Sequence, residues 1–200
     1  MKKLNQQKVE MKKFLFMSLL GILFGSCSSG KVEVTRQLEP FNKVNVVGNG
    51  QLYLEKSSSH SMKIMAKNES DMENLVTEVR DGELHIFHKS ESEKCKTPEY
   101  TIYLNHTEIS NLNLTGVFKI QSDEAIFQNE LAIRSQGILN GSLEVSVKNL
   151  DVNLEGISNL SISGHADSTA LKITGIGRIN TKGLKTGITN HVSKGYATIN

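Results

Sequence analysis

Residues 150–160 read LDVNLEGISNL, and this stretch decides the fold because its pattern recurs along the second half of the chain. Apolar Leu150 and Val152 alternate with polar residues ahead of the glycine. The same glycine returns at spacings of 21, 19, 19 and 20 residues, at Gly116, Gly137, Gly156, Gly175 and Gly195. A fixed period near twenty with strand-like alternation is typical of a β-solenoid. The sequence therefore predicts an all-β solenoid with about 20 residues per coil.

Strand-like alternation also runs through the first half of the chain, so one β body is expected from about residue 31 to residue 200. Asp81 and Gly82 form a hairpin signal, which predicts some antiparallel pairing there. Only residues 69–77 permit a helical turn. Asparagines at similar places after the glycines are expected to stack on one another in the corners of successive coils. They are Asn140, Asn159, Asn180 and Asn200.

The amino terminus has the anatomy of an export signal. Lysines precede the apolar run 14–24, which is shorter than the roughly 20 residues of a membrane-spanning helix. Residues 24–27 read FGSC and resemble a bacterial lipoprotein box, in which Cys27 becomes the lipidated first residue. Translation from Met1 or from Met11 gives the same mature protein. We therefore expect a signal peptide at 1–26, a lipidated cysteine and tether at 27–35, and the β-solenoid domain at 36–200.

Charge and cysteine content narrow the classes of function. Without residues 1–26 the chain has 18 basic and 20 acidic side chains, and its lysines are scattered rather than clustered. A nucleic-acid partner is therefore not expected. Cys95 is the only cysteine after Cys27, so no disulfide within the mature chain is predicted. An inert thiol is the favoured interpretation of Cys95, and pairing with another chain stays open.

Three segments carry a resemblance to a known family. Residues 36–46 read RQLEPFNKVNV, residues 48–54 read GNGQLYL, and residues 75–86 read LVTEVRDGELHI. Together with the glycine–isoleucine repeats, this order resembles the bacterial adhesin family named for its head GIN domain, found on envelope lipoproteins of the Bacteroidota. The resemblance covers residue 36 to the end. It implies a right-handed parallel β-helix-like fold and an adhesin role, and it supplies no catalytic residues.

An enzyme that cleaves acidic polysaccharides was the alternative to weigh, because some parallel β-helices use carboxylates on neighbouring coils. The positions just before the repeat glycines hold no such column of carboxylates. They are Thr115, Gln136, Glu155, Thr174 and Lys194. We therefore expect a non-enzymatic protein without a cofactor.

Metal and sugar sites receive little support from the sequence. His85, His88 and Cys95 are the only cluster of metal-ligand type, but two histidines three apart on a strand point to opposite faces. No metal site is predicted. The aromatic residues are scattered, so core packing is favoured over a dedicated sugar-binding platform. They include Tyr100, Tyr103, Phe118, Phe127 and Tyr196.

The sequence analysis predicts a non-enzymatic outer-membrane lipoprotein of a Gram-negative bacterium, anchored through Cys27 and acting as an adhesin or binding platform. A structural lipoprotein that faces the periplasm is the alternative, and a polysaccharide-active enzyme is a weaker one. Residues 28–31 lack the acidic residues that would favour export to the cell surface, so the face of the membrane stays open. Residues 196–200 keep a strand pattern, and we expect homo-oligomer formation through the C-terminal coil. The protein or glycan ligand is not identified by the sequence.

Overall fold

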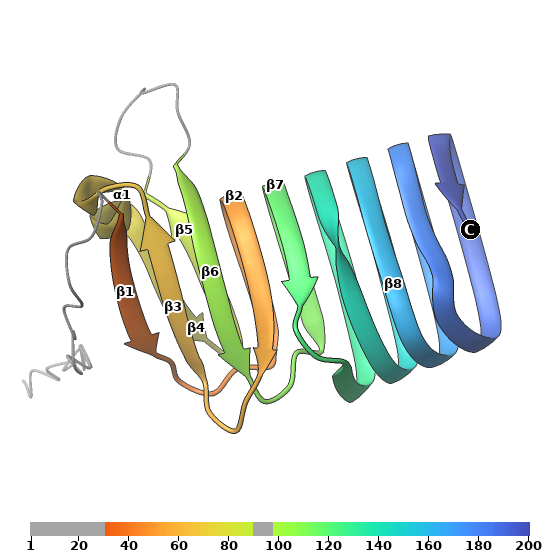
Figure 1. Cartoon of the computed structure of the whole chain (residues 1–200), viewed down its shortest axis with the longest axis horizontal. Coiled ribbons are helices and arrows are strands. Elements are labelled where there is room, and N and C mark those ends of the chain that lie inside the picture. The colour runs from red at the N-terminus through yellow and green to blue at the C-terminus, as the bar shows by residue number, and fades with distance from the viewer. Residues whose placement is uncertain (1–30, 90–97) are drawn as a thin grey trace, which may run out of the picture.

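The computed structural model describes residues 31–89 and 98–200. Within these ranges the chain is nearly all β, as predicted, and its eight strands form one open, curled sheet (Figure 1). The single helix of the described chain is α1, Glu69–Asn74. The strands are β1 Val32–Gln37, β2 Lys43–Lys56, β3 Ser61–Ala66, β4 Leu75–Arg80, β5 Glu83–His88, β6 Glu99–His106, β7 Asn111–Ser122 and β8 Ile126–Ile199.

Strand β2 explains why the sheet curls. Along one edge it pairs in parallel with β7 from Lys43 to Leu54. Along its other edge the first half pairs with β5 and the second half, from Asn49, pairs with β6. The two halves meet at Gly48 and Gly50, both at positive φ. The sheet therefore divides into a first wall, with β4, β5 and residues 43–47, and a second wall, with β1, β3, β6 and residues 49–56.

Strand β8 winds through several passes that lie side by side (Figure 1). Its first pass pairs in parallel with β7, which sets Gly116 beside Gly137. The next passes keep an offset of nineteen residues: a Cβ added to Gly156 would meet the carbonyl of Gly137, and one added to Gly164 would meet the carbonyl of Val145. The last pass is offset by twenty residues, with Gly195 beside Gly175. A constant offset at two places in one pass means that neighbouring passes run parallel. Residues that lie one predicted period apart in the sequence are therefore neighbours in space.

The repeat glycines allow this close approach. Gly156 has a φ of 118°, and a Cβ placed on it would lie 2.1 Å from the Gly137 carbonyl oxygen. In the same way, a Cβ on Gly116 would collide with the Gly48 carbonyl in β2, and one on Gly175 with the Gly156 carbonyl. Any side chain there would both strain the backbone and collide with the neighbouring pass.

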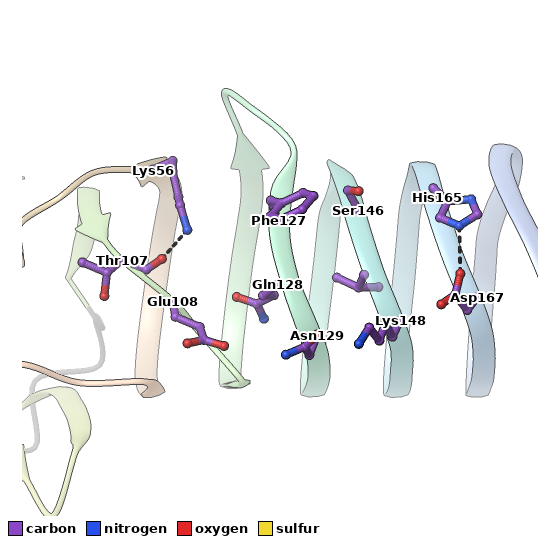
Figure 2. Close-up of a pocket in the computed structure, with 11 residues that line it drawn as sticks. Lys56, Thr107, Glu108, Phe127, Gln128, Asn129, Ser146, Lys148, His165 and Asp167 are labelled. Atoms are coloured by element: carbon purple, nitrogen blue, oxygen red, sulfur yellow. Dashed lines mark hydrogen bonds and ion pairs between the residues drawn. The ribbon is translucent and has the colours of Figure 1, made fainter.

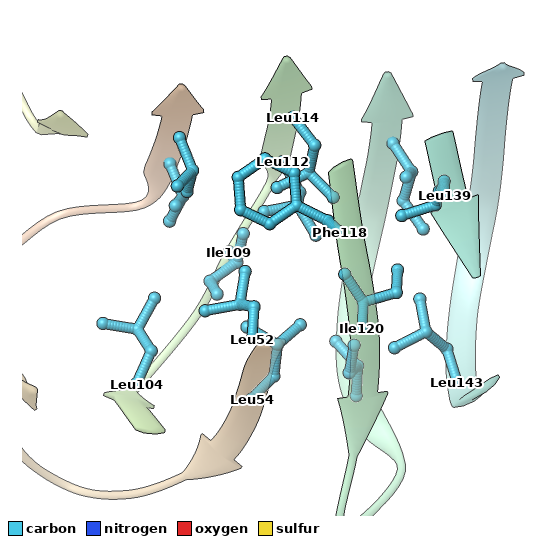
Figure 3. Close-up of a cluster of buried hydrophobic side chains, with 14 of the residues drawn as sticks. Leu52, Leu54, Leu104, Ile109, Leu112, Leu114, Phe118, Ile120, Leu139 and Leu143 are labelled. Carbon is cyan, nitrogen blue, oxygen red and sulfur yellow. The ribbon is translucent and has the colours of Figure 1, made fainter. Parts of the chain in front are cut away.

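The core fills the space enclosed by the walls. In the repeat at 150–160, Leu150, Val152, Leu154 and Leu160 are buried, together with Ser158, while the other residues between them are partly or fully exposed. The apolar side chains of β2, β6, β7 and the first passes of β8 meet in one cluster (Figure 3). The inward positions expected from the alternation are therefore correct for this repeat.

The first half of the chain is built differently. β4 and β5 form the antiparallel hairpin predicted at Asp81 and Gly82, and β3 pairs antiparallel with both β1 and β6. Helix α1 begins after its N-cap, Asn68, and contacts β3 and β4, which belong to different walls. Its Met72 is buried. The helix thus covers the end of the sheet that lies opposite the carboxyl terminus (Figure 1). The helical prediction at 69–77 was too long, because β4 begins at Leu75.

The predicted asparagine stack forms at one step. The Asn159 side-chain amide donates to Asn140 Oδ1 at 3.4 Å. Asn180 is outside this stack, because its side chain accepts from the backbone N–H of Lys182 in its own pass. Asn200 lies beside it through backbone bonds, with Asn200 N–H donating to Ile179.

Several predictions fall on residues 1–30 and 90–97, outside the described chain. These are the signal peptide, the lipidation of Cys27, the start of the tether and the environment of Cys95. Within the described residues, no helix is long and apolar enough to cross a membrane.

Candidate functional site

In each of three passes of β8, a short segment with outward-facing residues follows the second wall and precedes the start of the next pass. These segments lie side by side and form a strip. We call residues 126–129, 145–148 and 164–167 the outer strip. Buried side chains alternate with outward ones along it, so Ile126, Val145 and Ala166 anchor the strip to the core. The outward side chains form two rows, each with a step of nineteen residues. One row is Phe127, Ser146 and His165, and the other is Asn129, Lys148 and Asp167 (Figure 2).

The outer strip lines an open groove of about 400 Å³. Lys56, at the end of β2, and the segment Thr107–Glu108, after β6, close the side nearest the first half of the chain. Lys56 Nζ donates to the carbonyl oxygen of Thr107. The groove therefore joins side chains from β2, the β6–β7 connection and three passes of β8.

Phe127 is the most unusual residue of the groove, because 72% of it is exposed. Its position is fixed by its neighbours. Ile126 is buried, and the Gln128 side chain forms hydrogen bonds with the backbone of Ile109, accepting from its N–H at 3.0 Å and donating to its carbonyl. The phenyl ring is thus presented to solvent by a rigid backbone.

Polar groups surround this ring. At the far side of the groove, His165 Nε2 lies 3.0 Å from Asp167 Oδ1. Ser146 and Lys148 stand on the pass between Phe127 and this pair (Figure 2). The groove has two ammonium groups, Lys56 and Lys148, and two carboxylates, Glu108 and Asp167, so its formal charge is balanced. It offers an apolar face beside hydrogen-bonding groups rather than a single strong charge.

A buried histidine lies next to the groove. His106, the last residue of β6, is 1% exposed, and its Nδ1 has no hydrogen-bond partner in the described chain. Burial, together with the nearby charges of Lys56 and His60, lowers the pKa of His106 to about 4. The imidazole is therefore neutral at ordinary pH.

The two described histidines that were weighed as metal ligands, His85 and His88, contact different residues. His85 lies 3.7 Å from Glu83 on the same strand, and the ring of His88 faces Tyr100 at 6.5 Å. Cys95 lies outside the described residues. Among residues 31–89 and 98–200, no three His, Cys, Asp or Glu side chains gather as a metal site would require.

The aromatic residues divide between the core and the surface. Phe118 and Tyr100 are buried, as the packing interpretation expected. Tyr103 stacks on Tyr53 with ring centroids 4.8 Å apart. The packing interpretation was wrong for Phe127 and for Tyr196, which is 89% exposed. Only Phe127 lines the groove.

The outer strip was not predicted from the sequence. No chemical group recurs at the positions next to the repeat glycines, and the strip lies in the segments between the repeats. The available signal was the nineteen-residue step that links Phe127, Ser146 and His165. That step alone would have placed the three side chains in one row.

Comparisons with known proteins agree with this architecture. A crystallised adhesin-type protein of Bacteroides fragilis is 15% identical, with a TM-score of 0.72 over 86% of this chain and 97% of that chain. A lipid-binding-type protein of Parabacteroides distasonis is 17% identical, with a TM-score of 0.62 over 86% and 96%. An adhesin-type protein of Parabacteroides merdae is 19% identical, with a TM-score of 0.58 over 84% and 80%. At these identities the likeness establishes the fold alone.

None of the curated proteins compared with the chain matches it. Residues 40–200, however, match the model of the family described as "Putative auto-transporter adhesin, head GIN domain". The match covers most of the chain, including every strand except β1, every repeat glycine and the outer strip. The chain therefore belongs to the head GIN domain adhesin family.

Proposed function

We propose that this chain is a non-enzymatic lipoprotein of the outer membrane, anchored through Cys27, whose rigid β body serves as an adhesive binding platform. The fold that we propose for the body is a right-handed parallel β-helix-like solenoid with a closed first end. The observation that carries the proposal is the groove on the outer strip. It presents exposed groups for binding on a fixed backbone, while the outward positions beside the repeat glycines hold no paired carboxylates.

The electrostatics of the outward faces support a binding role over catalysis. Asp151, which is exposed, forms an ion pair with Arg134 at 3.1 Å rather than facing a second carboxylate. Glu155 has Gln136 and Thr174 at the same place in the neighbouring passes. General acid–base cleavage of a glycosidic bond uses two converging carboxyl groups.

An activity screen tests this part of the proposal. The full chain is incubated with uronate polymers and neutral polysaccharides, with and without calcium, and reducing ends are measured. We expect no release above the blank. Release that depends on Glu155 or Asp151 would make the protein an enzyme.

Lipidation is tested by labelling cells with a clickable palmitate analogue. Wild-type protein should carry the label and Cys27→Ser should not, because the acyl chains attach through that sulfur. Label that persists in Cys27→Ser would refute the anchor.

The face of the membrane separates an adhesin from a structural lipoprotein of the periplasm. Protease treatment of intact cells should digest the protein if it is displayed outside. Full protection, with digestion only after lysis, would favour the periplasmic role.

We further propose that a second copy docks on the last pass of β8. Apolar side chains are exposed there, with Ile188 at 69%, Val192 at 40% and Tyr196 at 89%. Burying such side chains in an interface is favourable by about 25 cal/mol per Å². Sedimentation should detect a dimer that Ile188→Asp weakens, and a wild-type chain that stays monomeric at high concentration would contradict this.

A further inference from the structure

We propose that the groove on the outer strip binds a neutral oligosaccharide, with Phe127 as the surface on which a sugar ring stacks. This inference rests on the proposed binding function and assigns it a site and a class of ligand. Three properties of the groove lead to it: an exposed aromatic face, mixed hydrogen-bonding groups and a balanced charge.

The exposed phenyl ring is the first property. A Phe side chain gains free energy when its apolar surface leaves water, so a ring that is 72% exposed on a rigid strand is available for a ligand. Sugar rings present a face of C–H groups that can pack on a flat aromatic surface. Because Ile126 and Gln128 fix the backbone on both sides, little conformational entropy is lost when the ring is covered.

The polar groups around the ring are the second property. Ser146 and Asn129 both donate and accept hydrogen bonds, and the His165–Asp167 pair adds an imidazole and a carboxylate. Sugar hydroxyls also donate and accept, so a set of mixed groups suits them. Asn129, Lys148 and Asp167 form a row beside that of Phe127, which places polar contacts along one edge of a stacked ring (Figure 2).

The balanced charge is the third property, and it selects against polyanions. Lys56 and Lys148 are offset by Glu108 and Asp167 within the same groove. A site for uronate polymers, phosphate or nucleic acid would need a clear excess of cations. A neutral glycan needs no such excess of cations.

The dimensions fit a chain segment better than an enclosed small molecule. The groove is open along its length and crosses passes that are spaced by about 4.8 Å. Lys56 and Thr107–Glu108 close one side, so a ligand can extend beyond the groove toward the later passes of β8, as the end of a polymer can. The open shape also predicts a modest affinity for any single short oligosaccharide.

The test uses the fact that the chain contains no tryptophan. Phe127→Trp keeps an aromatic face and installs one fluorophore in the groove. Full-length Phe127→Trp is titrated with cello-, manno-, malto- and N-acetylglucosamine oligosaccharides, and with polygalacturonate as the charged probe. We expect a saturable change in emission with at least one neutral series and a weaker response to polygalacturonate.

A matched pair of alanine variants then assigns the site. In calorimetric titrations, Phe127→Ala should bind the same oligosaccharide about tenfold more weakly, and Ile157→Ala should bind like the wild type. Both residues are exposed apolar side chains, so neither change should lower the melting temperature much, and of the two only Phe127 lines the groove. No saturable binding to any neutral series, a preference for polygalacturonate, or equal affinity of Phe127→Ala and wild type would overturn the proposal.

A cell assay separates this inference from the broader proposed function. Cells with Phe127→Ala should adhere less than cells with Ile157→Ala to a surface coated with the glycan identified by titration. If both variants adhere like the wild type and better than cells without the protein, the platform stands and the Phe127 site is wrong. If the purified protein binds glycan but no cells adhere through it, the site stands and the adhesive role fails.

Discussion

The two halves of this molecule pair their strands and treat the ends of the core in different ways. From β1 to β6 the chain uses antiparallel hairpins and the short helix α1, which closes one end of the core across both walls. From β7 onward it uses parallel passes at a nineteen- to twenty-one-residue step, and the last pass leaves Ile188 exposed. Repetition therefore builds the length of the body and most of the groove, whereas the irregular half supplies the cap.

The largest effect is expected from a charge in the repeated core. Leu154→Asp places a carboxylate at a fully buried position with no cation beside it, and should destabilise the fold by about 5 kcal/mol. The neighbouring control Ile157→Asp replaces a side chain that is 44% exposed and should cost far less. Urea unfolding followed by circular dichroism measures both, and equal losses would show that the inward face is assigned wrongly.

The repeat glycines give the next largest effect and compare the two halves directly. Gly156→Val should cost about 3 kcal/mol or more, because its Cβ meets a carbonyl oxygen and its φ is positive. Gly48 has a φ of 145° but no atom within 4 Å of the added Cβ. Gly48→Val should therefore show the backbone strain without the collision. The same melting temperature for both variants would mean that the passes can separate without loss.

Acid should destabilise the irregular half through His106. Its folded-state pKa, about 4, lies below the unfolded value of 6.5, so the neutral form is favoured in the native state. This stabilisation is fully present above pH 6.5 and is lost as the pH falls through 4, by about 3 kcal/mol in total. Unfolding free energies measured from pH 7 to pH 4 should show a drop that His106→Asn reduces. The exposed His191→Asn serves as control, and an unchanged slope in His106→Asn would contradict the assignment.

The smallest effect concerns the asparagine step. Asn159→Ala removes one long, exposed hydrogen bond to Asn140, so the loss should be below about 0.5 kcal/mol. Asn180→Ala removes a contact within a single pass and should behave similarly. A loss above 2 kcal/mol for Asn159→Ala alone would mean that side-chain stacking, not core burial, holds the passes together.

Those parts of the fold could be predicted from the sequence in which a repeated pattern along the chain corresponds to residues that are neighbours in space. The alternation of Leu150, Val152 and Leu154 and the spacing of the glycines both survive in the structure, because parallel passes place residue i beside residue i+19. The hairpin at Asp81 and Gly82 was also predictable from its turn residues. The division of β2 between two walls was not, because it depends on β5 and β6, which lie far along the chain.

The groove was harder to predict than the fold. Phe127 and His165 are 38 positions apart, and only the register of the passes brings them to one surface. Lys56 and Glu108 join them through the β2–β6 pairing, which leaves no periodic trace in the sequence. An isolated phenylalanine in the sequence also does not show whether its side chain points into the core or to solvent. This becomes clear only when the burial of its neighbours is known.

Adherence of intact cells is the decisive measurement for an adhesive platform with a glycan site at Phe127. Cells that carry the wild-type chain, cells without it, and cells with Phe127→Ala are compared for attachment to a glycan-coated surface, with the amount of protein at the surface measured by antibody. The account predicts strong attachment by the wild type, weak attachment without the chain, and an intermediate or weak value for Phe127→Ala. Equal attachment by all three, with the protein present at the surface, would contradict it.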